Sequence, residues 1–201
     1  MSLNFKKYGT ADKHLVILHG LFGSLDNWQS IAKELSAYYT VYIVDQRNHG
    51  KSPHYPEHNY TLMAQDLKGF LDEQGITKTN LLGHSMGGKT VMQFSIENPE
   101  YIERMIVADI APKYYAPHHQ DIIAALKSVD FEVCTSRQMV QEKIKESITN
   151  QGVQQFLLKG LTWVEKEKLG WKFNLDVLSS QIENIGEELV GFAYFTNPTL
   201  F

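Results

Sequence analysis

The sequence has little cysteine and no long hydrophobic run. Cys134 is the only cysteine among 201 residues, which excludes an intrachain disulfide framework and a cluster of thiolate zinc ligands. No apolar stretch approaches the roughly 20 residues that span a bilayer. The first residues, Met-Ser-Leu-Asn-Phe-Lys-Lys, lack the apolar stretch of a secretory signal. We therefore expect a soluble protein of the cytoplasm, without a membrane span.

A large excess of charge of one sign is also missing. The 19 basic residues are opposed by 23 acidic ones, for a formal net charge of -4, so a nucleic-acid partner is not expected. With 43% hydrophobic and 21% charged residues, the composition is that of a globular protein. The length supports one sizeable core with room for an inserted subdomain. Composition gives no indication of the oligomeric state.

Four short apolar runs are typical of strands buried on both faces of a parallel sheet. They lie at residues 15–18, 41–44, 80–82 and 105–108. Apolar residues at helical spacing fill the gaps, over 28–35 with Asp26 as a candidate cap, over 63–71, and from just past Ser85 to before Pro99. This alternation predicts an α/β fold built on a doubly wound, mostly parallel sheet.

The pattern changes after Pro112. Residues 113–190 show helical apolar stripes, denser charge and no convincing strand, which predicts a helical cap inserted into a core formed by residues 1–112. Residues 191–201 are expected to return to the core, and Asn197–Phe201 looks like the start of another buried strand. A chain that stops there is expected to have a C-terminally incomplete sheet.

The segment Gly83-His84-Ser85-Met86-Gly87 has the pattern G-x-S-x-G between an expected strand and an expected helix. A serine that turns sharply off a strand needs neighbours without side chains two positions before and after it. The hydroxyl is then exposed at the carboxyl edge of the sheet. The pattern therefore predicts Ser85 as a nucleophile.

The same residues also fit a phosphate-binding loop, because Gly83 is followed by Gly88-Lys89-Thr90 at the required spacing. A nucleotide-binding protein is thus an alternative from another functional class. The neighbouring segments favour the nucleophile.

One of those segments is His19-Gly20-Leu21-Phe22-Gly23, at the end of the first run. Acyl transfer needs preorganised N–H donors for the oxyanion of the tetrahedral intermediate. We expect them to be the backbone amides of Leu21 and Met86, with Phe22 in place of Leu21 if the loop is shifted by one residue. The His19 ring is expected to brace this loop.

A third segment has the pattern D-x-R-x-x-G-x-S, from Asp45 to Ser52. With the two motifs above it resembles the α/β-hydrolase superfamily. Its Arg-Asn-His-Gly form, residues 19–28 and residues 171–174 are similar to the YbfF-type esterases and the abhydrolase-domain-11 proteins. The resemblance implies a serine hydrolase without metal or organic cofactor. Asp45 and Arg47 are expected to pair and hold a loop beside the site.

The acid of a catalytic triad is expected at Asp109, as a buried carboxylate ending the fourth run; the alternative is a carboxylate at the entry to the cap. The base should follow the acid in sequence, and only His118 and His119 do. The resemblance instead places this histidine after the last strand, beyond residue 201. A truncated, catalytically inactive fragment or binding remnant therefore remains the alternative function.

The expected substrate is a small carboxylic ester or acyl thioester that is cleaved through an acyl-enzyme. Phe22, His84 and Trp163 are the candidate substrate contacts. Lipases, C–C bond hydrolases and cofactor-free haloperoxidases share the same triad, so the reaction class is less specific than the serine itself.

Overall fold

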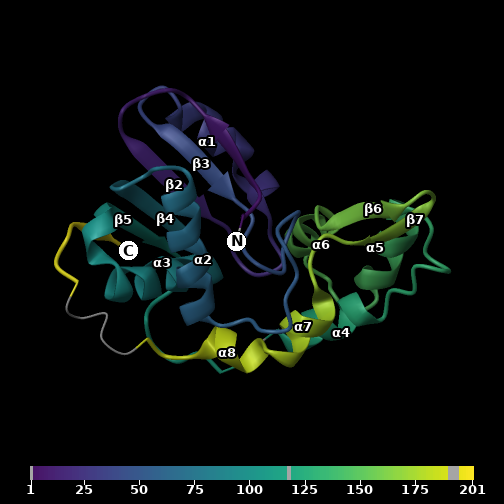
Figure 1. The fold of residues 1–201 in the computed structure, drawn as a ribbon. Helices are drawn as coiled ribbons and strands as arrows, with labels where there is room; N and C mark the ends of the chain where they lie inside the picture. The colour runs from purple at the N-terminus through teal and green to yellow at the C-terminus, as the bar shows by residue number, and fades with distance from the viewer. Residues whose placement is uncertain (1, 117–118, 190–194) are drawn as a thin grey trace.

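A computed structural model describes residues 2–116, 119–189 and 195–201. Six strands form one sheet in the order β1-β3-β2-β4-β5-β8, and Figure 1 labels β2, β3, β4 and β5 of this sheet. Only β1 runs antiparallel to its neighbour. The strands are β1 (Phe5–Tyr8), β2 (His14–Leu18), β3 (Thr40–Val44), β4 (Thr79–His84), β5 (Ile102–Ala108) and β8 (Thr199–Leu200). The predicted α/β fold with a mostly parallel sheet is confirmed.

Helices cover both faces of this sheet. One buried cluster joins the sheet to α2 and α3, and a smaller one joins its other face to the segment that contains α1. Burying apolar side chains in both layers is the main stabilising contribution to such a fold. The helices are η1 (Leu25–Trp28), α1 (Gln29–Leu35), α2 (Tyr60–Glu73), α3 (Met86–Glu97) and η2 (Pro99–Tyr101).

The expected cap at Asp26 is wrong. The first helical turn is capped by Ser24, whose backbone N–H donates to Asn27 Oδ1 at 2.8 Å. Asp26 lies within that turn and forms ion pairs with Lys6 and Lys172 at 3.0 and 3.1 Å. Its carboxylate therefore links the sheet to a distant part of the chain.

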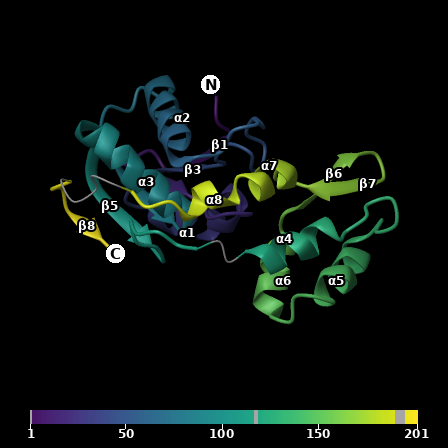
Figure 2. The ribbon, with the colours of Figure 1, turned by 90° about the horizontal axis from the view of Figure 1, so that it is seen from below.

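A second lobe lies beside the sheet in both views (Figures 1 and 2). It holds α4, α5, α6 and a hairpin of β6 and β7, and α7 and α8 lead back toward the sheet. The bounds are α4 (Gln120–Lys127), α5 (Arg137–Lys145), α6 (Gln151–Leu158), β6 (Leu161–Glu165), β7 (Lys168–Trp171), α7 (Leu175–Ser180) and α8 (Ile182–Gly186). No helix in the described ranges is both long and apolar enough to cross a membrane.

The strands β1, β6 and β7 were not predicted from the sequence. The expectation of no strand within 113–190 is wrong, because β6 and β7 pair antiparallel there. The two-residue turn between them is Lys166-Glu167 and lacks the usual Asn-Gly signal. Glu167 adopts the left-handed conformation that glycine or asparagine usually adopts there, with φ 66°. The domain boundaries at 112/113 and 190/191 stay predictions, and residues 190–194 lie outside the described ranges.

The C-terminal segment forms a strand but not a buried one. β8 pairs parallel with Met105 and Ile106 of β5. Leu200 and Phe201 are each 63% exposed, so the expectation of a buried strand is wrong. The reason is position, because β8 is the edge strand of the sheet that the described residues form.

We predict that Gly83→Ala destabilises the fold. A Cβ at Gly83 would lie 2.2 Å from Gly87 O and 2.7 Å from Gly88 Cα, and backbone atoms cannot move away cheaply. The free energy of unfolding, measured with urea, should fall by at least about 2–3 kcal/mol. Gly69→Ala in α2 is the matched control: a Cβ there meets nothing within 4 Å, so it should gain about 0.5–1 kcal/mol. Equal effects would contradict this steric account.

Candidate active site

Ser85 occupies the corner between β4 and α3. Its φ of 51° and ψ of -117° are strained for a residue with a side chain. Its backbone N–H donates to Ala108 O at 2.9 Å, and the residue is half-buried. A Cβ at Gly87 would lie 2.5 Å from Leu18 O, so the helix can approach β2 this closely only with glycine there. The predicted strand–turn–helix geometry is confirmed.

The loop 19–23 lies directly against this corner. A Cβ on Gly20 would be 3.3 Å from Ser85 Cβ. Phe22 adopts the left-handed conformation, with φ 60°, and its N–H donates to His49 Nε2 at 3.2 Å. Because the Phe22 amide is already bonded, the geometry favours Leu21 over Phe22 as the oxyanion donor beside Met86.

A cavity of about 340 Å³ opens beside Ser85. Its wall combines hydroxyl, carboxylate and imidazole groups with isoleucine side chains from α8. The lining residues are Tyr60, Ser85, Met86, Asp109, Ile110, Tyr115, Ala116, His119, Ile182, Ile185 and Gly186. The predicted nucleophile, the predicted acid and one of the two histidines after that acid therefore share one cavity. His118 lies outside the described residues.

Asp109 stands at the rim of this cavity. It follows β5 in a left-handed conformation, with φ 59°, and its side chain is 87% exposed. The expectation of a buried carboxylate is therefore wrong, because this turn directs Asp109 away from the strand. Its Oδ2 lies 3.9 Å from His84 Nε2, a contact that contributes little at such exposure.

The three expected substrate contacts are not brought together. Phe22 is buried and packs against Phe173, with ring centroids 5.2 Å apart. His84 lines a neighbouring cavity with Trp28. Trp163 lies on β6, is 61% exposed and lines neither cavity. The structure thus does not support Trp163 as a substrate contact, because its side chain is exposed on β6 and does not line the cavity beside Ser85.

Comparison with known proteins agrees with this geometry. The family described as alpha/beta hydrolase fold matches residues 13–133. The chain is 40% identical over 190 residues to "Esterase YbfF" of Escherichia coli (strain K12), covering 92% of this chain and 73% of that protein. The chain belongs to the alpha/beta hydrolase family.

Two further similar proteins are also named as ester-cleaving enzymes. "sn-1-specific diacylglycerol lipase ABHD11" of Mus musculus is 37% identical over 195 residues, covering 93% of this chain and 63% of that protein. The solved structure of a "Marine microorganism esterase" superposes with a TM-score of 0.96 at 42% identity, covering 100% of this chain and 79% of that one. The chain thus spans about two thirds to four fifths of these relatives.

The phosphate-loop alternative of this alpha/beta hydrolase sequence is wrong. Lys89 is fully buried. Its Nζ donates to Gly186 O at 3.2 Å and also to Glu187 O, and it lies 5.6 and 5.2 Å from the ring centroids of Tyr60 and Tyr115. An ammonium held by carbonyls and aromatic rings does not face a phosphate.

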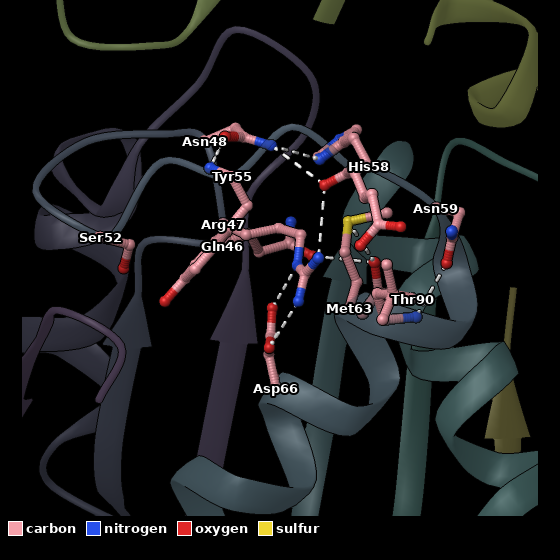
Figure 3. Close-up of polar contacts among 12 residues, drawn as sticks. Gln46, Arg47, Asn48, Ser52, Tyr55, His58, Asn59, Met63, Asp66 and Thr90 are labelled. Carbon is pink, nitrogen blue, oxygen red and sulfur yellow. Dashed lines mark hydrogen bonds and ion pairs between the residues drawn. The ribbon is translucent and has the colours of Figure 1, made fainter. Parts of the chain in front are cut away.

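The expected Asp45–Arg47 pair is also corrected. Arg47 instead forms a buried two-pronged ion pair with Asp66 of α2, Nε to Oδ2 at 2.5 Å and Nη2 to Oδ1 at 2.9 Å (Figure 3). Asp45 accepts from the backbone N–H groups of Leu25 and Lys51 at 2.7 and 3.0 Å. Both side chains hold the loop, as expected, but through separate partners. The sequence gives no signal for Asp66 beyond its being a charged residue in an amphipathic helix.

Three buried histidines, one of them His19 of the loop 19–23 itself, form a cluster. The ring centroids of His19 and His49 are 5.0 Å apart, and those of His49 and His58 are 5.7 Å apart. Asn48 Nδ2 donates to His58 Nδ1 at 3.4 Å (Figure 3). Burial lowers the pKa of His19 and His49, and lowers the pKa of His58 to about 3. All three imidazoles are therefore neutral near pH 7.

We predict that acid destabilises the protein through these histidines. As the pH falls below the ordinary imidazole pKa of 6.5, the unfolded chain binds protons that the folded chain does not. The free energy of unfolding should then fall between pH 6.5 and about 3, by up to about 1.4 kcal/mol per pH unit for each group.

Urea unfolding at pH 7.5 and 5.0 measures this slope. His58→Gln removes one titrating group and should reduce the slope by up to about 1.4 kcal/mol per pH unit. A free energy of unfolding that stays constant over this range in the unmodified chain would refute the prediction.

Proposed function

We propose that the protein is a serine hydrolase that cleaves carboxylic esters or acyl thioesters, with Ser85 as nucleophile. The observation that carries this proposal is the strained Ser85 corner with the loop 19–23 packed against it. Relatives named esterase and diacylglycerol lipase support an ester substrate. No metal or organic cofactor enters the proposed chemistry.

In the proposed reaction the Ser85 oxygen bonds to the acyl carbon while a general base takes its proton. The carbonyl oxygen becomes an oxyanion, held by the N–H groups of Leu21 and Met86. The C–O or C–S bond then breaks, and the alcohol or thiol leaves with a proton. Water cleaves the acyl-enzyme in the same way, releasing a carboxylic acid and restoring the serine hydroxyl.

Asp109 is proposed as the acid that orients the base. In support, Asp109 follows β5 in a left-handed conformation and lines the same cavity as Ser85. The base is expected, from the resemblance, to follow the last strand of the complete fold. His119 shares the cavity and is the alternative that this chain itself supplies.

Residues 113–190 are proposed to act as a cap over the site. In support, Ile182 and Ile185 of α8 line the cavity beside Ser85. With Ile110 they give it an apolar side that suits the acyl part of an ester.

In the full-length protein, which is proposed to carry the histidine base, we expect Ser85→Ala to abolish ester hydrolysis. Removing the nucleophile of a triad lowers kcat by about 10⁴-fold or more, whereas Ser180→Ala, at an exposed serine of α7, should leave kcat unchanged. Release of p-nitrophenol from short-chain p-nitrophenyl esters measures both. Undiminished turnover by Ser85→Ala would disprove the assignment of the nucleophile.

Labelling with a fluorophosphonate probe tests whether residues 1–201 hold a working base. Rapid modification of Ser85 requires the proton to be removed. We expect slow labelling of this chain by itself, and no further decrease on His119→Ala. Rapid labelling that His119→Ala abolishes would instead assign the base to His119. Slow labelling together with no turnover matches the inactive-fragment alternative.

A further inference from the structure

The loop 19–23 must be held in a conformation that it would not adopt alone. Phe22 has φ 60°, a left-handed backbone conformation that is strained for a residue with a side chain. Gly23 N–H donates to Gly20 O at 3.0 Å and closes a turn within the loop. One turn does not fix the loop relative to Ser85, so contacts from outside the loop are needed.

The first end of the loop is fixed through His19. Gln46 N–H donates to His19 Nε2 at 3.1 Å, and Gln46 Nε2 donates to His19 O at 2.7 Å. The Gln46 amide oxygen in turn accepts from the Thr90 hydroxyl of α3 at 2.8 Å. This end is therefore tied to the helix that begins after Ser85.

The other end of the loop is held by one fully buried imidazole, that of His49. Its Nδ1 lies 3.0 Å from Arg47 O. A carbonyl oxygen can only accept, so Nδ1 carries the proton and Nε2 is the free acceptor. That acceptor receives the Phe22 N–H at 3.2 Å.

We propose that His49 is a positioning residue for the oxyanion site, holding the strained Phe22 amide so that the neighbouring Leu21 N–H points to the acyl oxygen at Ser85. This inference rests on the proposed function and deepens it. His19 and His49 act reciprocally: each ring takes a backbone N–H from the loop that carries the other. The Phe173 ring packs against both residues, with its centroid 6.4 Å from that of His49 and 5.2 Å from that of Phe22.

Two substitutions of His49 distinguish the role of its Nε2 acceptor from the role of the ring's volume. His49→Gln places an amide oxygen near the position of Nε2, so it can still accept from Phe22. His49→Asn is shorter and reaches only the Arg47 carbonyl. In the full-length protein, we expect His49→Asn to lower kcat by about 10²-fold, the effect of losing one oxyanion donor, with KM changed less than about threefold. His49→Gln should stay within about fivefold of the unmodified kcat, as should the control His54→Asn on an exposed histidine.

A second measurement does not depend on turnover or on any variant. Imidazole ¹⁵N NMR spectra of the chain should show His49 as the neutral Nδ1–H tautomer, and the Phe22 amide should be protected from hydrogen exchange. An Nε2–H tautomer, an unprotected Phe22 amide, or a His49→Asn variant with unmodified kcat would overturn the proposal. If the unmodified protein cleaves no ester, the proposed function fails, and these spectra still decide whether His49 holds the loop.

Discussion

The close approach of three backbone segments at one corner of the sheet is the constraint on which the site depends. The loop after β2, the end of β4 and the start of α3 meet at distances that leave no space for a Cβ at Gly20, Gly83 or Gly87 without displacing neighbouring atoms. The strain at Ser85 persists because this packing fixes the backbone on both sides of it. Backbone packing therefore positions Ser85, the proposed nucleophile.

The sheet and the serine corner could be predicted because their signals are local. Buried parallel strands are continuous apolar runs, and the glycines around Ser85 are a direct consequence of backbone contact. The hairpin of β6 and β7 could not be predicted in this way. Its strands carry exposed Trp163 and Val164, and its turn uses a glutamate where a glycine or asparagine is the usual signal.

The partners of the site residues were harder to predict than the residues. Arg47 was recognised from its motif, but its partner Asp66 lies 19 positions away on a helix, where a charged residue is normally solvated. The burial of Asp109 was wrongly expected, since a strand end does not reveal the turn that follows it. His49 belongs to a recognised motif, yet its bond to Phe22 joins two loops that meet only in the folded chain.

Lys89 connects two walls of the cavity, α3 and α8. This side chain belongs to α3, the helix that starts next to Ser85, and its ammonium is held by carbonyls at the end of α8. The Tyr60 hydroxyl adds a 2.7 Å bond to Ile185 O. Moving α8 outward to admit a bulkier molecule would leave the buried Lys89 ammonium without its carbonyl acceptors, at a free-energy cost of several kcal/mol. This wall of the cavity is thus tied to α3, the helix that begins next to Ser85, so a displacement of α8 is coupled to that helix.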